Sequence, residues 1–465
     1  MERKVNQADF NEVVLENIVE FDMEEAEAID SAVSQLEAQG VNLQNVIFDK
    51  EVIHGVDEIS KFHKLYSNVE VIDDEEIEAF LASLDSASTL ADKDTKYKLY
   101  AGRMDVHSIV INVLKCKMEE PTLVERILRN LTTIVSGYPD LVDESTISFI
   151  INLFNKYLSD DCIMLSTANL ILKSLTKHEN NKQNFFTNEK SRPILKTLIE
   201  TEKYQLVKIG CDLITCLCQD DDIRVEISAA HTRATSLAED FLSQCYTKLK
   251  SQHDVPLTNA IIRAVTSMSV TNQLVSNLYE LDPEFKILIE LFNDFRKEVD
   301  ILHNVTKLLV ALSGNDVCKS AMAPLIPLVV NGIDTFMASR KVVQSLFLVI
   351  SSLSLRSKPN ALAFIELNAV DKIVQAMKVH AHIKLRRYGC MALRNIASSS
   401  KITQPFDESG VVELINSLLI NRSNEFLEED CKSVLIALGA PVSLTERWTG
   451  KRGDVVGDNQ KLLDR

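Results

Sequence analysis

Side chains that could catalyse a reaction are present in this 465-residue chain, but their spacing matches no catalytic or metal-binding pattern. The nine histidines form no HExxH pair, and His380 and His382 are two residues apart in an expected turn, a poor geometry for two metal ligands. The chain has no glycine-rich phosphate loop, dinucleotide fingerprint or nucleophile elbow. The sequence therefore predicts no catalytic residue, no cofactor and no metal site.

The nine cysteines are odd in number and scattered, and none forms a CxxC pair. This pattern argues against a disulfide framework or a zinc site and indicates buried free thiols in a reducing compartment. Cys216 and Cys218 lie near an expected helix end in an apolar run, so buried thiols are favoured there over a redox pair. We therefore expect a cytoplasmic (cytosolic) protein, and nothing in the sequence bars it from the nucleus.

A second group of residues suits binding rather than catalysis. Several basic side chains recur in segments that we expect to be equivalent helices, and two asparagines occur in the same segments. If these residues share a concave face, they would attract acidic segments of protein clients. The alternative is an ordinary solvated helix surface, since Lys and Arg are usually exposed. The candidate protein-binding residues are Arg126, Asn130, Lys208, Arg263, Lys307, Arg387, Arg394 and Asn395.

The elements that would position these residues repeat about every 42 residues. The clearest unit, 360–400, reads as three short helical pieces, and the last of them has apolar or small residues on one helix face. With Ile396 as an anchor, the same apolar ending recurs 40 to 44 residues apart, except for one spacing of 51 between Leu217 and Met268. That longer spacing marks an insertion. The other anchors are Val135, Leu175, Leu312, Leu353 and Leu438.

A helical unit of this length cannot bury its own apolar face, so neighbouring units must stack into a continuous core. Small residues such as Gly210, Gly389 and Ala392 would let adjacent helices approach closely. The sequence thus predicts an all-α fold, a right-handed α-solenoid of the armadillo type with an acidic, helical or flexible N-terminal segment. We expect amphipathic helices over 1–40, an acidic and partly flexible segment over 41–100, about eight repeats over 101–441 with an insertion near 219–256, and a tail over 442–465.

The charge of the chain is concentrated at its N-terminus. Residues 1–100 hold 24 acidic and 8 basic side chains, whereas the whole chain has a net charge of −17. One hypothesis is that residues 70–85 fold back onto the basic groove, and the alternative is a solubilising tail. The apolar stripe Phe10, Val14, Ile18 and Phe21 could dock into a partner or, as we favour, cap the first repeat.

Composition argues against two other classes of protein. The acidic net charge, the absence of a basic stripe and an aromatic content of 6% disfavour nucleic-acid binding. No window of about 20 residues is apolar enough to span a membrane, and the acidic N-terminus does not read as a signal peptide. We expect partners that are proteins, with neither nucleic acid nor membrane among them.

Several segments outside the recurrent apolar ending resemble one particular family of armadillo repeat proteins. The segment FNEVVLENIVEFDMEEAEAIDSAVSQLEAQGVNLQNVI at 10–47 and the ending VSLTERWTGKRG at 442–453, which holds the single tryptophan, Trp448, resemble those of the armadillo repeat-containing protein 6 family. DDDIRVEISAAH at 220–231 resembles its inserted segment, although 226–230 departs from its pattern, and ALRNIA lies in its penultimate repeats. The resemblance implies a cytosolic repeat protein without enzymatic activity.

Armadillo-type nuclear-import receptors grip basic peptides with a ladder of Asn and Trp on their third helices. In this chain only Asn395 stands at an Asn position, and no Trp stands at a Trp position. We therefore reject the import-receptor interpretation. The favoured function is a non-enzymatic scaffold or adaptor that binds protein segments on the concave face, and the alternative is an adaptor that acts through its two termini with the array as a spacer. Trp448 could serve as a binding hot spot or as a plug on the last repeat.

Overall fold

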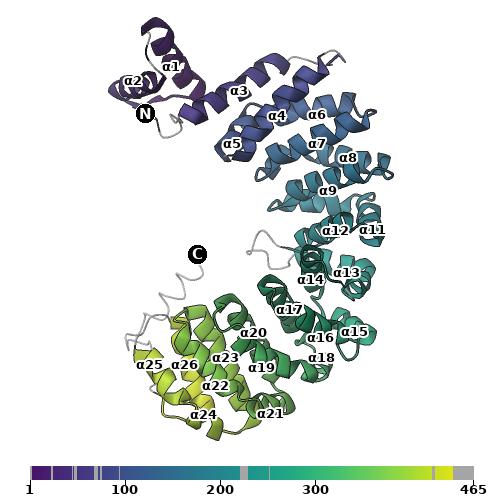
Figure 1. The fold of residues 1–465 in the computed structure, drawn as a ribbon, viewed down its shortest axis with the longest axis vertical. Helices are drawn as coiled ribbons and strands as arrows, with labels where there is room; N and C mark the ends of the chain where they lie inside the picture. Colours follow the sequence, from purple (N-terminus) through teal and green to yellow (C-terminus); the bar gives the residue numbers. More distant parts are fainter. Residues whose placement is uncertain are drawn as a thin grey trace, which may run out of the picture. The chain divides into compact units, whose positions relative to one another are not determined.

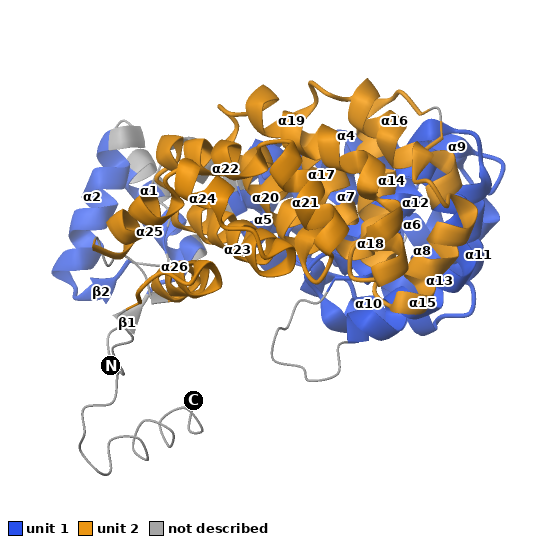
Figure 2. Cartoon of the chain, turned by 90° about the horizontal axis from the view of Figure 1, so that it is seen from below, with its two compact units in different colours: residues 1–245 blue, residues 246–465 orange. Residues whose placement is uncertain are grey.

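The computed structural model describes residues 3–21, 23, 25–43, 46, 50–67, 72–73, 76–93, 95–219, 229–250, 252–420 and 425–442. These residues are almost entirely helical, and the strands among them are two segments of two residues each, β1 (Arg3–Lys4) and β2 (Val41–Asn42), which pair in parallel. The chain divides into two compact units, residues 1–245 and 246–465 (Figure 2). The fold is an all-α solenoid, as the sequence predicts.

Each unit contains a layer of stacked helices that we call the third helices, and all but the first of them end at or close to a predicted anchor (Figure 1). Within a unit, each third helix packs against the next one along the chain. All the anchors except Leu438 are fully buried. The third helices are α4 (Ile77–Lys93), α7 (Pro121–Val135), α9 (Asp161–Leu175) and α12 (Tyr204–Leu217) in the first unit, and α14 (Val255–Met268), α17 (Val299–Leu312), α20 (Arg340–Ser354), α23 (Ile383–Ser400) and α26 (Glu425–Leu438) in the second.

Other helices and 3-10 turns connect the third helices. In the first unit they are α3 (Lys50–Tyr66), α5 (Thr95–Arg103), α6 (Val106–Cys116), the 3-10 turn η1 (Pro139–Leu141), α8 (Glu144–Lys156), α10 (Glu179–Thr187) and α11 (Ser191–Glu200). In the second unit they are α15 (Asn272–Leu281), α16 (Lys286–Asp294), α18 (Asp316–Ala321), the 3-10 turn η2 (Ala323–Leu325), α19 (Ile326–Thr335), α21 (Lys358–Glu366), α22 (Ala369–Val379), α24 (Gln404–Glu408) and α25 (Val411–Ile420).

The 42-residue period reappears in the hydrogen bonds between repeats. Lys203 bonds to Asp161, 42 residues earlier, and Asn395 bonds to Ser351, 44 residues earlier. The buried amide of Asn360 donates to Leu353 O at 3.1 Å and to Lys319 O, 41 residues earlier, at 3.2 Å. These bonds satisfy carbonyl groups at helix ends, which would otherwise be costly to bury. The period is therefore maintained by specific polar contacts as well as by the apolar anchors.

The predicted small residues allow close helix packing. A Cβ atom added to Gly210 would lie 2.9 Å from Leu198 Cβ, and one added to Gly389 would lie 2.4 Å from Met377 Sδ. Both distances are far below van der Waals contact. These glycines are needed because neighbouring helices pack directly against the backbone at these two points.

The longer spacing between Leu217 and Met268 contains one long helix, α13 (Ala229–Lys248). Arg233 of this helix is 1% exposed and binds Glu179 at 2.6 Å and Leu217 O at 2.6 Å. The inserted stretch therefore contributes a buried helix to the stack. Residues 220–228 of the predicted insertion lie outside the described residues.

The segment 41–100 was predicted to be partly flexible, and the structure differs there. It contains α3, α4 and α5, and α4 packs against α7 as a further third helix. Arg126 of α7 donates to Asp85 of α4, with Nε 3.1 Å from Oδ2, and Asn130 donates to the same carboxylate at 2.7 Å. The acidic residues of α4 therefore belong to the stack, which contradicts the fold-back hypothesis for residues 77–85.

The N-terminal helices α1 (Gln7–Phe21) and α2 (Glu25–Ala38) form a hairpin with a small core of its own. Phe10 and Val14 are buried against α2, whereas Phe21 is 63% exposed. Phe10 and Val14 therefore pack inside this hairpin, which corrects our interpretation of them as a cap on the first repeat, and the side chain of Ile18 lies outside the described part of the chain. The predicted tail motif around Trp448 lies outside the described residues.

Candidate functional site

The exposed side of the third helices is the surface on which the sequence places its candidate binding residues. The structure puts all eight of these residues on third helices, but it uses several of them to join neighbouring helices. Asn130 is 8% exposed and bonds to Asp85, and Asn395 is 4% exposed and bonds to Ser351 O and Oγ at 2.9 Å. These two amides are structural, because their hydrogen-bonding groups are already occupied within the array.

Basic candidates also bind other side chains of the array. Arg126 binds Asp85 and Glu78, and Arg387 binds Asp430 of α26 with Nε 2.7 Å from Oδ2. Lys208 pairs with Asp212 one helical turn away at 3.0 Å. Arg394 Nε donates to the side chain of Asn395 at 3.1 Å. Exposed pairs of this kind contribute about 0–1 kcal/mol each, so these cations remain partly available to a ligand.

Arg263 and Lys307 are exposed on α14 and α17. Lys307 lies close enough to His303 for its charge to lower the pKa of that imidazole, which burial lowers further, to about 4. His303 Nδ1 lies 2.6 Å from Ser345 Oγ of α20, so it also joins two third helices. A histidine at this position is therefore neutral at neutral pH and adds no charge to the surface.

The distribution of charge differs between groups of third helices. The helices α14, α17, α20 and α23 contain eight basic residues and one acidic residue, Asp300. The helices α4, α7, α9 and α12 contain five basic and six acidic residues, and α26 contains four acidic residues and Lys432. The basic residues of the first set, all exposed or half-buried, are Arg263, Lys307, Arg340, Lys341, Lys384, Arg386, Arg387 and Arg394; we call their surface the basic face.

Sequence reasoning missed four members of the basic face. Arg340, Lys341, Lys384 and Arg386 all lie in the first turns of α20 and α23. The positive end of the helix dipole disfavours cations at these positions, so local helix stability does not explain them. Counting acids and bases over each whole helix, instead of at single equivalent positions, would have found these residues.

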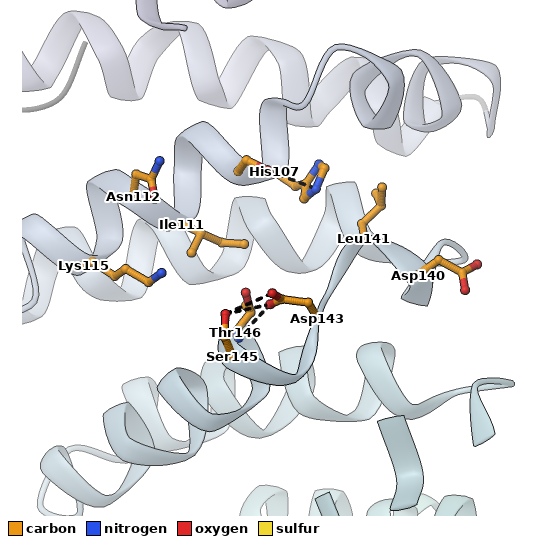
Figure 3. A pocket seen from close by; sticks show the side chains of 10 residues that line it. His107, Ile111, Asn112, Lys115, Asp140, Leu141, Asp143, Ser145 and Thr146 are labelled. Carbon is orange, nitrogen blue, oxygen red and sulfur yellow. Dashed lines mark hydrogen bonds between the residues drawn. The ribbon is translucent and has the colours of Figure 1, made fainter. Parts of the chain in front are cut away.

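A polar pocket of about 330 Å³ lies between α6 and the start of α8 (Figure 3). Its lining includes His107, which is 9% exposed and whose pKa is lowered by burial, and Asp143, which caps α8. His107 Nε2 lies 3.2 Å from Ser108 Oγ, but among the described residues no group bonds to Nδ1. An acyl-transfer triad needs an acid that orients the imidazole through its second nitrogen. The His107–Ser108 pair does not have one.

None of the nine cysteines, all of which lie in the described part of the chain, forms a disulfide, and their burial differs from the prediction in part. Six of them are buried, Cys218 is half-buried, and Cys116 and Cys162 are exposed. Among the described residues, no group of three or more His, Cys, Asp and Glu side chains is arranged to hold a metal ion. In the same part of the chain, no helix is both long and apolar enough to cross a membrane.

Comparisons with known proteins agree with this architecture. The ARMC6 family model matches residues 59–457, and the Armadillo repeat-containing protein 6 N-terminal domain matches residues 2–62. The Armadillo repeat-containing protein 6 homolog of Drosophila melanogaster is 28% identical over 467 residues, covering 97% of this chain and 98% of the relative. The Homo sapiens Armadillo repeat-containing protein 6 is 24% identical, covering 69% of this chain and 67% of the relative.

Among solved structures, the crystal structure of an engineered protein matches with a TM-score of 0.66 and 11% identity, covering 93% of this chain and all of the engineered one. This likeness concerns the fold alone. Arrays of this kind present extended surfaces and are typical of protein-binding scaffolds without enzymatic activity. The two family models together account for nearly the whole sequence. The chain therefore belongs to the armadillo repeat-containing protein 6 family.

Proposed function

We propose that this chain is a non-enzymatic scaffold or adaptor that binds acidic segments of other proteins on the basic face. The observation that carries the proposal is the ratio of eight basic residues to one acidic residue on four adjacent third helices, in a chain whose net charge is −17. A local excess of one sign raises the concentration of oppositely charged ligands and speeds their association. An extended acidic segment is the partner whose shape and charge suit such a surface.

Helix energetics support the same proposal. Arg340 and Lys384 lie in the first turns of α20 and α23, where each cation costs about 0.3–1 kcal/mol through the helix dipole. Lys341, in the same turn as Arg340, is already paired with Asp300 at 2.7 Å. Cations placed against the local preference of a helix are expected where a ligand compensates for them. None of the nine cysteines forms a disulfide, which supports a reducing compartment, and we propose a cytoplasmic location.

The test is the binding of a fluorescent peptide rich in Glu and Asp, measured by anisotropy. The triple variant Lys307→Glu, Arg340→Glu, Lys384→Glu should weaken binding by at least about tenfold, which corresponds to about 1.4 kcal/mol. The control variant Lys297→Glu, Lys358→Glu, Lys378→Glu changes the net charge equally at exposed residues outside the third helices and should bind nearly as the wild type does. Equal weakening in both variants would contradict the proposal, because it would show an effect of net charge alone.

A second candidate is an adaptor that works through its termini. The α1–α2 hairpin favours this candidate, because the hairpin has a core of its own. Its two helices also contain eight acidic residues and no basic residue. Such a hairpin could bind a basic partner while the array acts as a spacer. A labelled peptide rich in Lys and Arg distinguishes the two: substituting the exposed Asp9, Glu12, Glu16 and Asp30 by Asn or Gln should then abolish its binding, and the variants of the basic face should not.

A further inference from the structure

The last of the described third helices, α26, has exposed apolar side chains on its outer side. In the third helices before it in this unit, the next third helix packs against the corresponding side. In α20, Ser351 stands two residues before the anchor Leu353 and is 3% exposed, because Asn395 of α23 lies on it. In α26, Ile436 stands two residues before the anchor Leu438 and is 58% exposed. The position at which Ser351 of α20 receives the next third helix is therefore occupied in α26 by an uncovered isoleucine.

At a second position, α26 has an exposed apolar residue where the third helices just before it have charged ones. Twelve residues before the anchor, α17, α20 and α23 carry the charged residues Asp300, Lys341 and Lys384. The equivalent residue of α26 is Phe426, which is 60% exposed, although its ring lies 5.1 Å from the guanidinium of Arg387. Terminal repeats normally have a polar outer surface, because nothing stacks on them. Here the helix has apolar residues where a polar surface is expected.

The C-terminal segment of the chain has the chemistry to cover this side. We propose that residues 443–465, which lie outside the described part of the chain, dock on α26 over Ile436 and Phe426. The segment contains Leu444 and Trp448 as large apolar side chains, with Arg447, Lys451 and Arg452 beside them. The uncovered side of α26 also carries the exposed Glu429, so charge and apolar character both match. The bound segment takes the place of a further repeat.

The geometry at the end of α26 permits this docking. Gly439 has φ of +69°, and the N–H of Ala440 donates to Leu435 O at 2.9 Å, so the chain turns out of the helix there. The roughly nine residues from Gly439 to Trp448 can span up to about 30 Å. The helix itself, with 14 residues, is about 21 Å long. Trp448 can therefore reach Ile436, which lies one turn before the end of α26, and also Phe426.

The single tryptophan makes the proposal directly measurable in the full-length protein. In the docked state, the emission of Trp448 should be blue-shifted relative to a free indole and poorly quenched by acrylamide. Ile436→Asn should shift the emission to the red and increase the quenching constant several-fold, with no change in far-ultraviolet circular dichroism. Phe426→Asn gives a second, independent variant on the same side of the helix. Both side chains lie on the outer side of α26, so neither substitution should unfold the helix.

Val379→Asn is the matched control, because Val379 is 61% exposed on α22, and it should leave the emission unchanged. Wild-type emission that matches an exposed indole would overturn the proposal, as would emission insensitive to both Ile436→Asn and Phe426→Asn. A blue shift that disappears on dilution would also overturn it, since the segment would then be docked on a second copy. None of these outcomes depends on the acidic client, so this test is separate from that of the basic face.

Discussion

Individual polar residues in this chain act mainly as connections between repeats. Asn181 is 3% exposed, and its amide donates to Ser174 O at 2.9 Å and to Pro139 O, 42 residues earlier, at 3.1 Å. Asn360 makes the equivalent pair of bonds in the second unit. One side chain thus satisfies the end of its own repeat and a carbonyl of the previous one. Such residues fix the stacking distance, because they cannot be satisfied in any other register.

Substituting Asn395 tests whether its side chain stabilises the contact between α20 and α23. Asn395→Ala should lower the free energy of unfolding by about 1–3 kcal/mol, because it removes the two hydrogen bonds that the buried amide donates to Ser351 O and Oγ. Arg394→Ala, at the adjacent half-buried position, should change it by no more than about 0.5 kcal/mol. Chemical denaturation of the two variants gives the comparison. Equal stability of Asn395→Ala and the wild type would show that the amide does not join the helices.

His303 should make stability depend on pH. Burial first, and then the charges of Lys307 and Lys341, lower its pKa to about 4 from the ordinary value of 6.5, while Asp300 opposes them. Above pH 6.5 both the folded and the unfolded states hold a neutral imidazole. As the pH falls from 6.5 towards 4, the unfolded state binds a proton that the folded state does not, so stability decreases.

The measurement is the free energy of unfolding of the wild type and of His303→Gln across this pH range. The variant has no imidazole to protonate, so its stability should fall less steeply than that of the wild type as the pH falls. Parallel curves would mean that His303 titrates alike in both states. The carboxylates titrate in both proteins, so comparing the slopes isolates the histidine.

At the scale of helices, the sequence predicts those helices that carry a buried apolar residue at the regular spacing of about 42 residues. The eight anchors lie at or near the ends of third helices, because a buried residue must recur once in each stacked unit. That α4 belongs to the stack was missed, because its neighbourhood is rich in acids and has no anchor with the recurrent ending. Its place in the stack depends on Asp85 meeting Arg126 and Asn130, and the rotation of two helices about their axes decides such a contact.

The same reasoning explains how much of the candidate site could be predicted. That Arg263 and Lys307 are exposed on third helices follows from the period, and the structure agrees. The period does not predict that Asn130 and Asn395 are buried, because a polar side chain at the margin of a helix face can point either to solvent or to the neighbouring helix. Only the packed neighbour, Asp85 in one case and Ser351 in the other, decides the outcome.

Close packing of helices at glycine gives a prediction for a whole element. Gly210→Ala should destabilise the α11–α12 contact, because the new methyl group would lie 2.9 Å from Leu198 Cβ, an atom that cannot move without its helix. Overpacking costs about 1–3 kcal/mol, offset by about 1 kcal/mol of gained helix propensity. Gly314→Ala is the control, since its added Cβ would meet only Ala311 O, at 3.4 Å. Hydrogen exchange in α11 and α12 should accelerate in the first variant and not in the second.

At the scale of the molecule, acidic and basic charge are kept on different parts of the chain. Residues 1–100 carry 24 acidic and 8 basic side chains, whereas α14, α17, α20 and α23 carry one acidic and eight basic. The acidic excess keeps the net charge far from zero, which favours solubility. If the basic face binds acidic clients as proposed, the acidic residues of 1–100 and of α26 would repel those clients. Selectivity for one surface then follows from the repulsion elsewhere as much as from the attraction there.

This distribution of charge predicts how client binding depends on salt. Raising the salt concentration from about 0.1 to about 1 M shortens the Debye length from about 10 to about 3 Å, so attraction between exposed charges is largely screened. The affinity of the wild type for the acidic peptide should therefore fall steeply over this range. The variant Lys307→Glu, Arg340→Glu, Lys384→Glu should show a much flatter dependence, because it has lost exposed cations that salt would screen. Isothermal titration at several salt concentrations measures both slopes. A wild-type affinity that does not change with salt would mean that the peptide is held by apolar contacts, and the basic face would then not be its binding surface.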